Sequence, residues 1–281
     1  MRKKKSKLFR TGVNPFVHVV LIIILLFQVY PLSTMIINSF RTDASIKRSP
    51  LGLPDLMAFD NYISTWQRGG YARAYINSVL VGAAVIFLVL LATGLAAYSM
   101  VKLELPHRNF FSGYFLLVMA IPTFLYIVPV YYLFHNMNLT DNLAGLILVY
   151  TANQIPFNLM LIRTFMIGMP KELEEASRVD GASEFKTFLK ITLPLAKPIF
   201  ITVALLVFVQ TWNEFLWANT FLSSEEWKTV ATRFVKFVGE HNSDLSKIFT
   251  AGCISLGPII VLYLFLQRHF IEGMTSGSVK A

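Results

Sequence analysis

Long stretches without a charged side chain dominate the sequence. No Asp, Glu, Lys or Arg occurs between Arg73 and Lys102, and a slightly longer uncharged run separates Arg10 from Arg41. A helix of about 20 mainly apolar residues crosses the hydrocarbon core of a bilayer. Inside that core every backbone N–H and C=O must find a partner within the protein. We therefore expect an all-α chain that crosses a membrane repeatedly.

Six stretches of the sequence are long and apolar enough to be spans. They are residues 16–37, 75–100, 110–134, 143–163, 198–218 and 249–268. The composition agrees, because 55% of the residues are hydrophobic and 15% are charged, whereas soluble domains have roughly 45–50% and 25%. A soluble enzyme is excluded. The sequence predicts a polytopic inner-membrane protein with six transmembrane helices.

Lys and Arg are distributed unevenly around these spans. Residues 1–15 carry six of them, and cytoplasmic segments are the ones enriched in Lys and Arg. With this end inside, 16 of the 25 basic residues are cytoplasmic, so the net charge of +9 reflects topology. It suits contact with lipid and requires no nucleic-acid partner. We predict a basic cytoplasmic tail (1–15), a six-span domain (16–270) and a cytoplasmic carboxyl tail (271–281).

Motifs for catalysis are absent from the sequence. The single cysteine, Cys253, excludes an intrachain disulfide and a cysteine metal cluster, and no Gly-x-x-x-x-Gly-Lys-Ser/Thr phosphate loop occurs. The only acid in a predicted span is Glu214, which lies about 26 Å beyond Lys197 at 1.5 Å per residue, near the outer surface. A proton-driven carrier usually needs an acid deeper than that. No catalytic residue, metal or cofactor is expected in this chain.

The polar connection between the fourth and fifth spans predicts two short helices. Glu174 and Arg178 have the i, i+4 spacing of a favourable acid–base pair. Gly181 can adopt positive φ and end the first helix. Ser183 can cap a second helix, which Pro194 is expected to end.

This connection, residues 166–197, has three physical interpretations. It is a hairpin that lies on the membrane and joins two spans, a DNA-binding helix-turn-helix, or a docking element for a soluble partner. Tethering at both ends and an acidic first helix make contact with DNA phosphates unfavourable. The other two interpretations remain open from the residues alone.

The same connection resembles the "EAA" loop of binding-protein-dependent ABC importer permeases. The matching residues are Glu175-Ala176-Ser177, Asp180-Gly181-Ala182, Ile191 and Leu193-Pro194, with Ser177 in place of an alanine. The resemblance implies the transmembrane-domain fold of a type I ABC importer. It implies that the residues coupling this chain to an ATPase are Glu174, Glu175, Ala176, Ser177, Asp180, Gly181, Ala182, Ile191, Leu193 and Pro194.

The resemblance extends beyond that loop. Residues 212–218 (WNEFLWA) and the carboxyl end from 265 to 281 are similar to the smaller six-span subunit of maltose-type transporters. This similarity points to the carbohydrate uptake group. It implies a permease that moves a carbohydrate, of the oligosaccharide class, across the cytoplasmic membrane of a prokaryote.

The family resemblance also implies the partners of the chain. They are a second homologous permease, two ATP-binding subunits that hold ATP and Mg²⁺, and an extracytoplasmic sugar-binding protein. The carboxyl tail would contact the ATPase through Thr275, Ser276, Gly277, Ser278, Val279 and Lys280. The outer loop would contact the binding protein through Glu240, Asn242 and Asp244. Amides within the spans are candidates for the substrate pathway, namely Gln154, Asn158, Gln210 and Asn213.

Two other functions are alternatives to an ABC permease. A secondary carrier would transport substrate by itself with an ion gradient. A membrane-anchored interaction protein would not transport at all. The absence of a midplane acid argues against the first. The second predicts that deletion of the chain causes no sugar-dependent growth defect.

Overall fold

The computed structural model describes residues 15–54, 57–103, 105–238 and 244–276, with side chains up to residue 265. Every regular element within these ranges is helical, which confirms the predicted all-α fold. The chain divides into two compact units, Met1–Thr65 with Phe237–Cys253 and Trp66–Lys236 with Ile254–Ala281. The elements are α1 (Pro15–Ser39), α2 (Asp43–Arg48), α3 (Asp60–Gly69), α4 (Tyr71–Val101), α5 (Arg108–Met119), η1 (Thr123–Leu125), α6 (Ile127–Asn136), α7 (Leu143–Ile167), α8 (Glu172–Val179), α9 (Glu184–Thr187), η2 (Phe188–Thr192), α10 (Leu193–Leu195), α11 (Lys197–Asn213), α12 (Leu216–Phe221), η3 (Val230–Phe237) and α13 (Leu245–Ser276).

Among the described residues, four helices are long and apolar enough to cross a membrane. They are α1, α4, α7 and the Leu245–Phe265 part of α13. A fifth span is present if the two helical runs Glu184–Leu195 and Lys197–Asn213, which meet at 77°, are one broken span. Most side chains of α1 are exposed within its unit although the helix is almost entirely apolar, as suits a helix that crosses a membrane.

The predicted third span is divided instead of continuous. Its helices α5 and α6 are separated by the 3-10 turn η1, which begins after Pro122. Proline lacks a backbone N–H and clashes with the preceding turn, so it ends a helix that tertiary contacts do not hold. The predicted fifth span is also interrupted, because α11 ends at Asn213 and α12 begins at Leu216.

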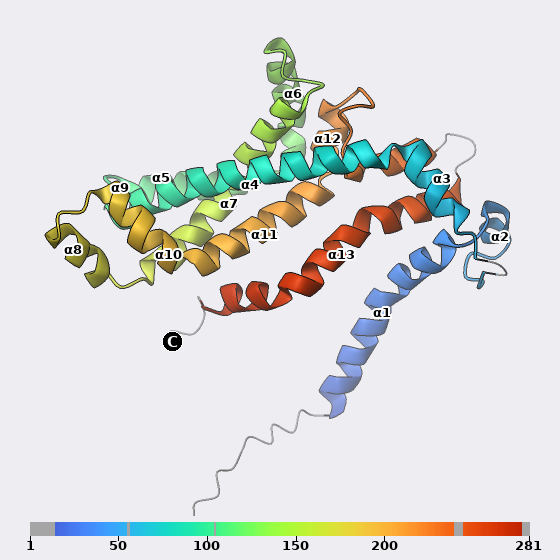
Figure 1. Cartoon of the computed structure of the whole chain (residues 1–281), viewed down its shortest axis with the longest axis horizontal. Coiled ribbons are helices and arrows are strands. Elements are labelled where there is room, and N and C mark those ends of the chain that lie inside the picture. Colours follow the sequence, from blue (N-terminus) through green and yellow to red (C-terminus); the bar gives the residue numbers. More distant parts are fainter. Residues whose placement is uncertain (1–14, 55–56, 104, 239–243, 277–281) are drawn as a thin grey trace, which may run out of the picture. The chain divides into compact units, whose positions relative to one another are not determined.

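The larger unit is built around three packed helices, α4, α7 and α11 (Figure 1). Along α4 the buried residues Val81, Val85 and Val89 recur every four positions and form one stripe. Close packing needs small residues in some places: a Cβ on Gly94 would lie 2.8 Å from the ring of Phe200 on α11. The stripe therefore fixes how α4 sits against its neighbours.

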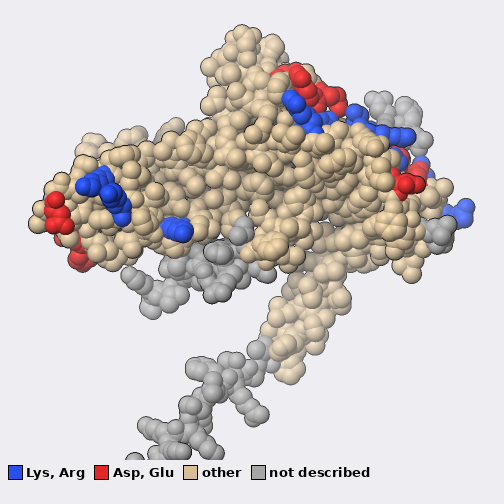
Figure 2. Space-filling model, viewed as in Figure 1, with Lys and Arg blue, Asp and Glu red and all other residues tan. Residues whose placement is uncertain are grey.

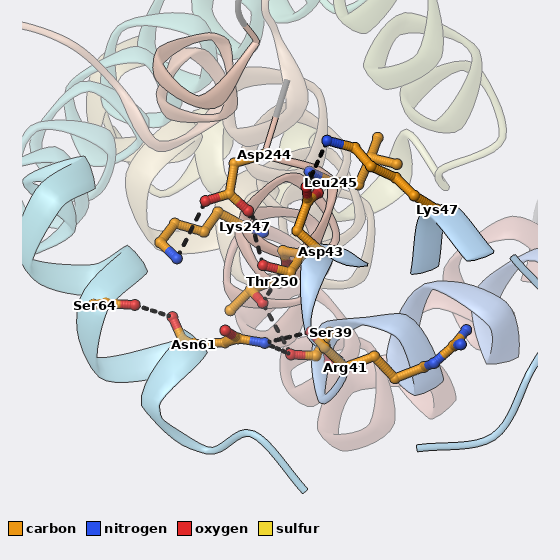
Figure 3. A network of polar contacts seen from close by, with 11 residues as sticks. Ser39, Arg41, Asp43, Lys47, Asn61, Ser64, Asp244, Leu245, Lys247 and Thr250 are labelled. Atoms are coloured by element: carbon orange, nitrogen blue, oxygen red, sulfur yellow. Dashed lines mark hydrogen bonds and ion pairs between the residues drawn. The ribbon is translucent and has the colours of Figure 1, made fainter. Parts of the chain in front are cut away.

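The smaller unit contains a hydrogen-bond network that joins segments far apart in the sequence (Figure 3). Asn61 of α3 donates to the carbonyls of Ser39 and Arg41, each at 2.9 Å. Thr250 of α13 donates to the same Ser39 carbonyl at 3.1 Å, and Asp43 accepts from the Leu245 N–H at 2.9 Å. These bonds join the end of α1, α2, α3 and the start of α13.

Gly145 in the first turn of α7 tests this packing. A Cβ there would lie 1.7 Å from the carbonyl oxygen of Leu139, and only a backbone shift could relieve that contact. We expect Gly145→Ala to destabilise the purified protein by about 2 kcal/mol or more, measured as a lower melting temperature.

The matched control is Gly113→Ala on α5, where a Cβ meets nothing within 4 Å. Alanine is favoured over glycine in helices by about 1 kcal/mol, so this variant should melt no lower than the wild type. Equal melting temperatures for Gly145→Ala and the wild type would contradict the described packing.

Candidate functional site

The connection over residues 166–197, called the interspan hairpin from here on, folds as two short helices. The first, α8, ends in a Schellman motif: the Ala182 N–H donates to the Ser177 carbonyl and the Gly181 N–H to the Arg178 carbonyl, each at 3.0 Å. Gly181 has φ +75°, a conformation that glycine adopts without strain. Ser183 caps α9 by accepting from the Lys186 N–H. Both predicted helix boundaries are confirmed.

The second helical run does not end where the sequence predicted. The run continues from α9 through the π-helical turn η2 and α10, and it reaches Leu195 beyond Pro194. The sharp bend follows at Ala196. Ile191 and Leu193 are partly buried in this run, whereas Pro194 is exposed.

Glu174 and Glu175 of α8 have opposite environments. The expected Glu174–Arg178 pair is wrong: Glu174 is 3% exposed, and its carboxylate lies 3.1 Å from the ammonium of Lys102 at the end of α4. Thr192 also donates to Glu174 at 3.3 Å. Glu175 is exposed with Ala176 beside it. One acid therefore anchors α8 inward, and the next faces outward.

A second set of polar contacts joins α8, α9 and α4. The Arg178 guanidinium lies 2.7 Å from Glu184, and the Tyr98 hydroxyl donates to the same carboxylate at 2.8 Å. The hydroxyls of Ser177 and Thr187 hydrogen-bond to each other in the buried space between the helices. Arg178, and then Tyr98, hold the pKa of the Glu184 carboxyl below its usual 4.5.

Apolar and charged side chains are both exposed on the interspan hairpin. Leu173, Val179, Phe185 and Leu189 are 44% to 86% exposed. Figure 2 shows some of the Lys, Arg, Asp and Glu side chains of this face at the end where α8 and α9 lie, beside the uncharged surface of the long helices. An exposed apolar patch with a polar rim is typical of a protein-binding surface.

A cavity of about 350 Å³ lies at the other end of the larger unit, and is called the polar cavity here. Its position coincides with the two breaks in the helices, at η1 and between α11 and α12. Irregular backbone at membrane depth occurs where it is buried in protein or lines a water-filled cavity. The lining residues are Thr123, Phe124, Tyr150, Asn153, Gln154, Gln210, Glu214, Leu216 and Trp217.

The four amides predicted for the substrate pathway are in different places. Gln154 and Gln210 line the polar cavity. Asn158 is buried and donates to the Gln154 carbonyl, and Asn213 is exposed and donates to the Val209 carbonyl, so neither lines it. Sequence reasoning missed Asn153, although it is one residue from Gln154.

Glu214 has a clear local role in the polar cavity. Its carboxylate accepts hydrogen bonds from the backbone N–H groups of Trp217 and Ala218 at 3.1 and 3.2 Å, and from the Tyr150 hydroxyl at 2.7 Å. These bonds satisfy the first N–H groups of α12, which otherwise lack partners. The Asn213-Glu214 sequence between two apolar runs is the signal that could have located this break.

The remaining predicted contact residues belong to the outer loop and the carboxyl tail. Asp244 accepts from Ser246 and from the Lys247 N–H and ammonium, and so caps the start of α13. Glu240, Asn242 and residues 277–280 lie outside the described residues, and the Thr275 and Ser276 side chains are likewise outside them. Within the described ranges no group of three His, Cys, Asp or Glu residues could hold a metal ion.

Comparison with known proteins adds a family and a fold to this geometry. Residues 89–276 match the family model for the "Binding-protein-dependent transport system inner membrane component". The structure is similar to a solved chain from a bacterial ABC transporter involved in the import of the acidic polysaccharide alginate. The TM-score is 0.79 at 23% identity, covering 95% of this chain and 100% of that one.

Several curated proteins are similar over most of their length. The probable ABC transporter permease protein YurM of Bacillus subtilis is 33% identical, covering 99% of this chain and 91% of YurM. The diacetylchitobiose uptake permease NgcG of Streptomyces coelicolor is 29% identical, covering 94% of this chain and 88% of NgcG. The trehalose transport permease SugB of Mycobacterium tuberculosis is 30% identical, covering 86% of this chain and 89% of SugB.

The contacts of Glu184 predict a pH dependence. Because its pKa is lowered in the folded protein, its stabilising contribution is complete above the unfolded value near 4.5 and is lost as the pH falls through the lower folded value. We expect Glu184→Gln to melt below the wild type by a constant margin at pH 6–8, and this margin to shrink below about pH 4.5. A margin independent of pH would contradict the ion pair.

Proposed function

The chain belongs to the binding-protein-dependent transport system inner membrane components, and on this premise we propose that it is the permease subunit of an ATP-driven importer for oligosaccharides. It is a multi-pass bacterial inner-membrane protein, and ATP is hydrolysed on a partner chain. Relatives named for diacetylchitobiose, arabinooligosaccharides and trehalose support a carbohydrate substrate.

The interspan hairpin is the surface proposed to dock on the ATPase. The observation that carries this proposal is the separation of Glu174 from Glu175: one is buried against Lys102 at the end of α4, and the other is exposed, as are Val179 and Phe185. A partner that buries this face would gain apolar area and an ion pair with Glu175. A movement of the partner would then displace the hairpin, and the hairpin would displace the spans joined to it.

The proposed complex contains a second permease, two ATP-binding subunits that hold ATP and Mg²⁺, and an extracytoplasmic sugar-binding protein. Six crossings are proposed, with α5, η1 and α6 together forming the third and both termini in the cytoplasm. The basic segment 1–15 supports this orientation. The tail 275–280 is proposed to reach the ATPase, and residues 240–244 to contact the binding protein.

The polar cavity is proposed as part of the substrate pathway. Its amides and the carboxylate of Glu214 can bond sugar hydroxyls, and Phe124 and Trp217 offer apolar ring faces. The Gln210 side chain is exposed, and no hydrogen bond from it to a described residue exists. An amide at membrane depth without a protein partner needs water or a ligand.

Uptake of a sugar panel tests the proposed function directly. The chain, its second permease, the ATPase and the loaded binding protein would be reconstituted in liposomes with ATP inside. We expect ATP-dependent accumulation of an oligosaccharide and none from this chain alone. Ion-driven flux through this chain alone, or no uptake of any carbohydrate by the complex, would contradict the proposal.

Changing the exposed face of the hairpin should release the ATPase. We expect the double variant Glu175→Lys with Gly181→Trp to co-purify at least about tenfold less ATPase, equivalent to about 1.4 kcal/mol. The charge reversal removes the outward acid, and tryptophan cannot adopt the positive φ of Gly181 without strain. Glu226→Lys, an equal reversal at an exposed site near η3, serves as the control and should retain the ATPase. Full assembly and transport by the double variant would contradict docking through this face.

Removing an amide from the polar cavity should weaken transport. We expect Gln210→Leu to raise the substrate concentration that gives half-maximal uptake by roughly five- to tenfold, as for one lost hydrogen bond of about 1 kcal/mol or more. Gln28→Leu on α1 is the matched control, because Gln28 is an exposed amide that does not line this cavity. Equal effects of the two variants would contradict the assignment.

A further inference from the structure

The end of α4 is attached to the interspan hairpin by a buried ion pair. The side chains of Lys102 and Glu174 are 1% and 3% exposed, with 3.1 Å between ammonium nitrogen and carboxylate oxygen. The ammonium also donates to the Met169 carbonyl at 3.3 Å, and Thr192 donates to the carboxylate at 3.3 Å. Lys102 therefore contacts the chain before α8 and on α8, and Glu174 contacts the turn after α9.

Because this ion pair is buried, it is costly to break. Burying two charges gives little net stability, but removing one partner leaves an unpaired charge and is costly. Because moving α8 away from α4 would separate these buried charges, the pair holds α8 against the end of α4. The hairpin is covalently joined only to α7 and α11. The buried ion pair, together with the Tyr98–Glu184 hydrogen bond, connects it to a third helix, α4.

The opposite part of α4 is attached to the connection between α12 and η3. The Asn77 amide donates to the carbonyls of Glu226 and Lys228 at 2.8 and 3.0 Å. The Ser78 hydroxyl oxygen accepts from the Val230 N–H at 2.9 Å. Asn77 and Ser78 are both buried.

Between these two attachments α4 is one uninterrupted helix. It contains no proline, and Asn77 and Lys102 are about 38 Å apart along its axis at 1.5 Å per residue. It packs against both α7 and α11. Such a helix transmits a displacement from one end to the other.

Building on the proposed function, we propose that Lys102 and Glu174 are positioning residues, which bind the ATPase-docking hairpin to α4 so that α4 carries its displacement to the outer segment 226–230. The binding protein is expected on that outer side. The ion pair thereby couples the ATPase to the loaded binding protein. Neither residue touches substrate.

The test measures ATP hydrolysis by the complete complex in lipid nanodiscs. Its readout is the ratio of activity with sugar-loaded binding protein to activity without it, per assembled complex. A merely structural role would change the amount of assembled complex but not this ratio. We expect Glu174→Gln and Lys102→Met each to lower the ratio at least fivefold, and the charge swap Lys102→Glu with Glu174→Lys to restore it to within twofold.

The variant Asn77→Leu tests the other end of α4. Because Asn77 is uncharged, this variant leaves no buried charge without a partner. We expect it to lower the ratio by a similar factor. Ser99→Ala is the matched control on α4, because the Ser99 hydroxyl bonds only to the Leu95 carbonyl of its own helix, and it should keep the wild-type ratio.

The outcomes separate this inference from the function on which it rests. A wild-type complex that no loaded binding protein stimulates would overturn the proposed function. A stimulated wild type with an unchanged ratio in Asn77→Leu, or in assembled single variants at Lys102 and Glu174, would overturn only the role of α4. Where the single variants fail to assemble, a charge swap that assembles without restoring the ratio overturns it as well.

Discussion

The requirement that buried backbone groups be hydrogen-bonded shapes this protein more than any other constraint. In hydrocarbon an unpaired N–H or C=O costs several kcal/mol, so spans are continuous helices unless protein or water takes over the lost bonds. The interruptions near Pro122 and at Glu214 are therefore informative. At the second, the Glu214 carboxylate bonds the free N–H groups of α12, and both interruptions line one polar cavity.

Charged groups are few and are concentrated where partners are expected. Within the interspan hairpin, two neighbouring acids differ in burial and therefore in role. Glu174 is paired with Lys102 inside the protein, and Glu175 is left on the exposed face. A rigid attachment behind an adaptable surface is what a docking element needs, because a force applied to the surface reaches the spans only through fixed contacts.

Some local signals in the sequence predicted local structure correctly, whereas the expected Glu174–Arg178 pair and the helix end at Pro194 were wrong. Gly181 and Ser183 were identified as helix boundaries because positive φ and side-chain capping depend on neighbouring residues alone. The partner of Glu174 was not predicted, because Lys102 lies 72 positions earlier and only tertiary packing brings it close. The same limit applies to the cavity, where Asn153 joins residues from three other segments, and to span interruptions that hydropathy averages conceal.

The central claim is that the exposed face of the interspan hairpin lies against an ATP-binding subunit. Val179 is 86% exposed on that face, and Cys253 is the only native cysteine. Site-specific cross-linking from a Val179→Cys, Cys253→Ser variant in the assembled complex tests the claim most directly. The account predicts one dominant product with the ATPase, whose yield changes when ATP is added. Cross-linking to lipid alone or to the second permease, with no ATPase product, would contradict it.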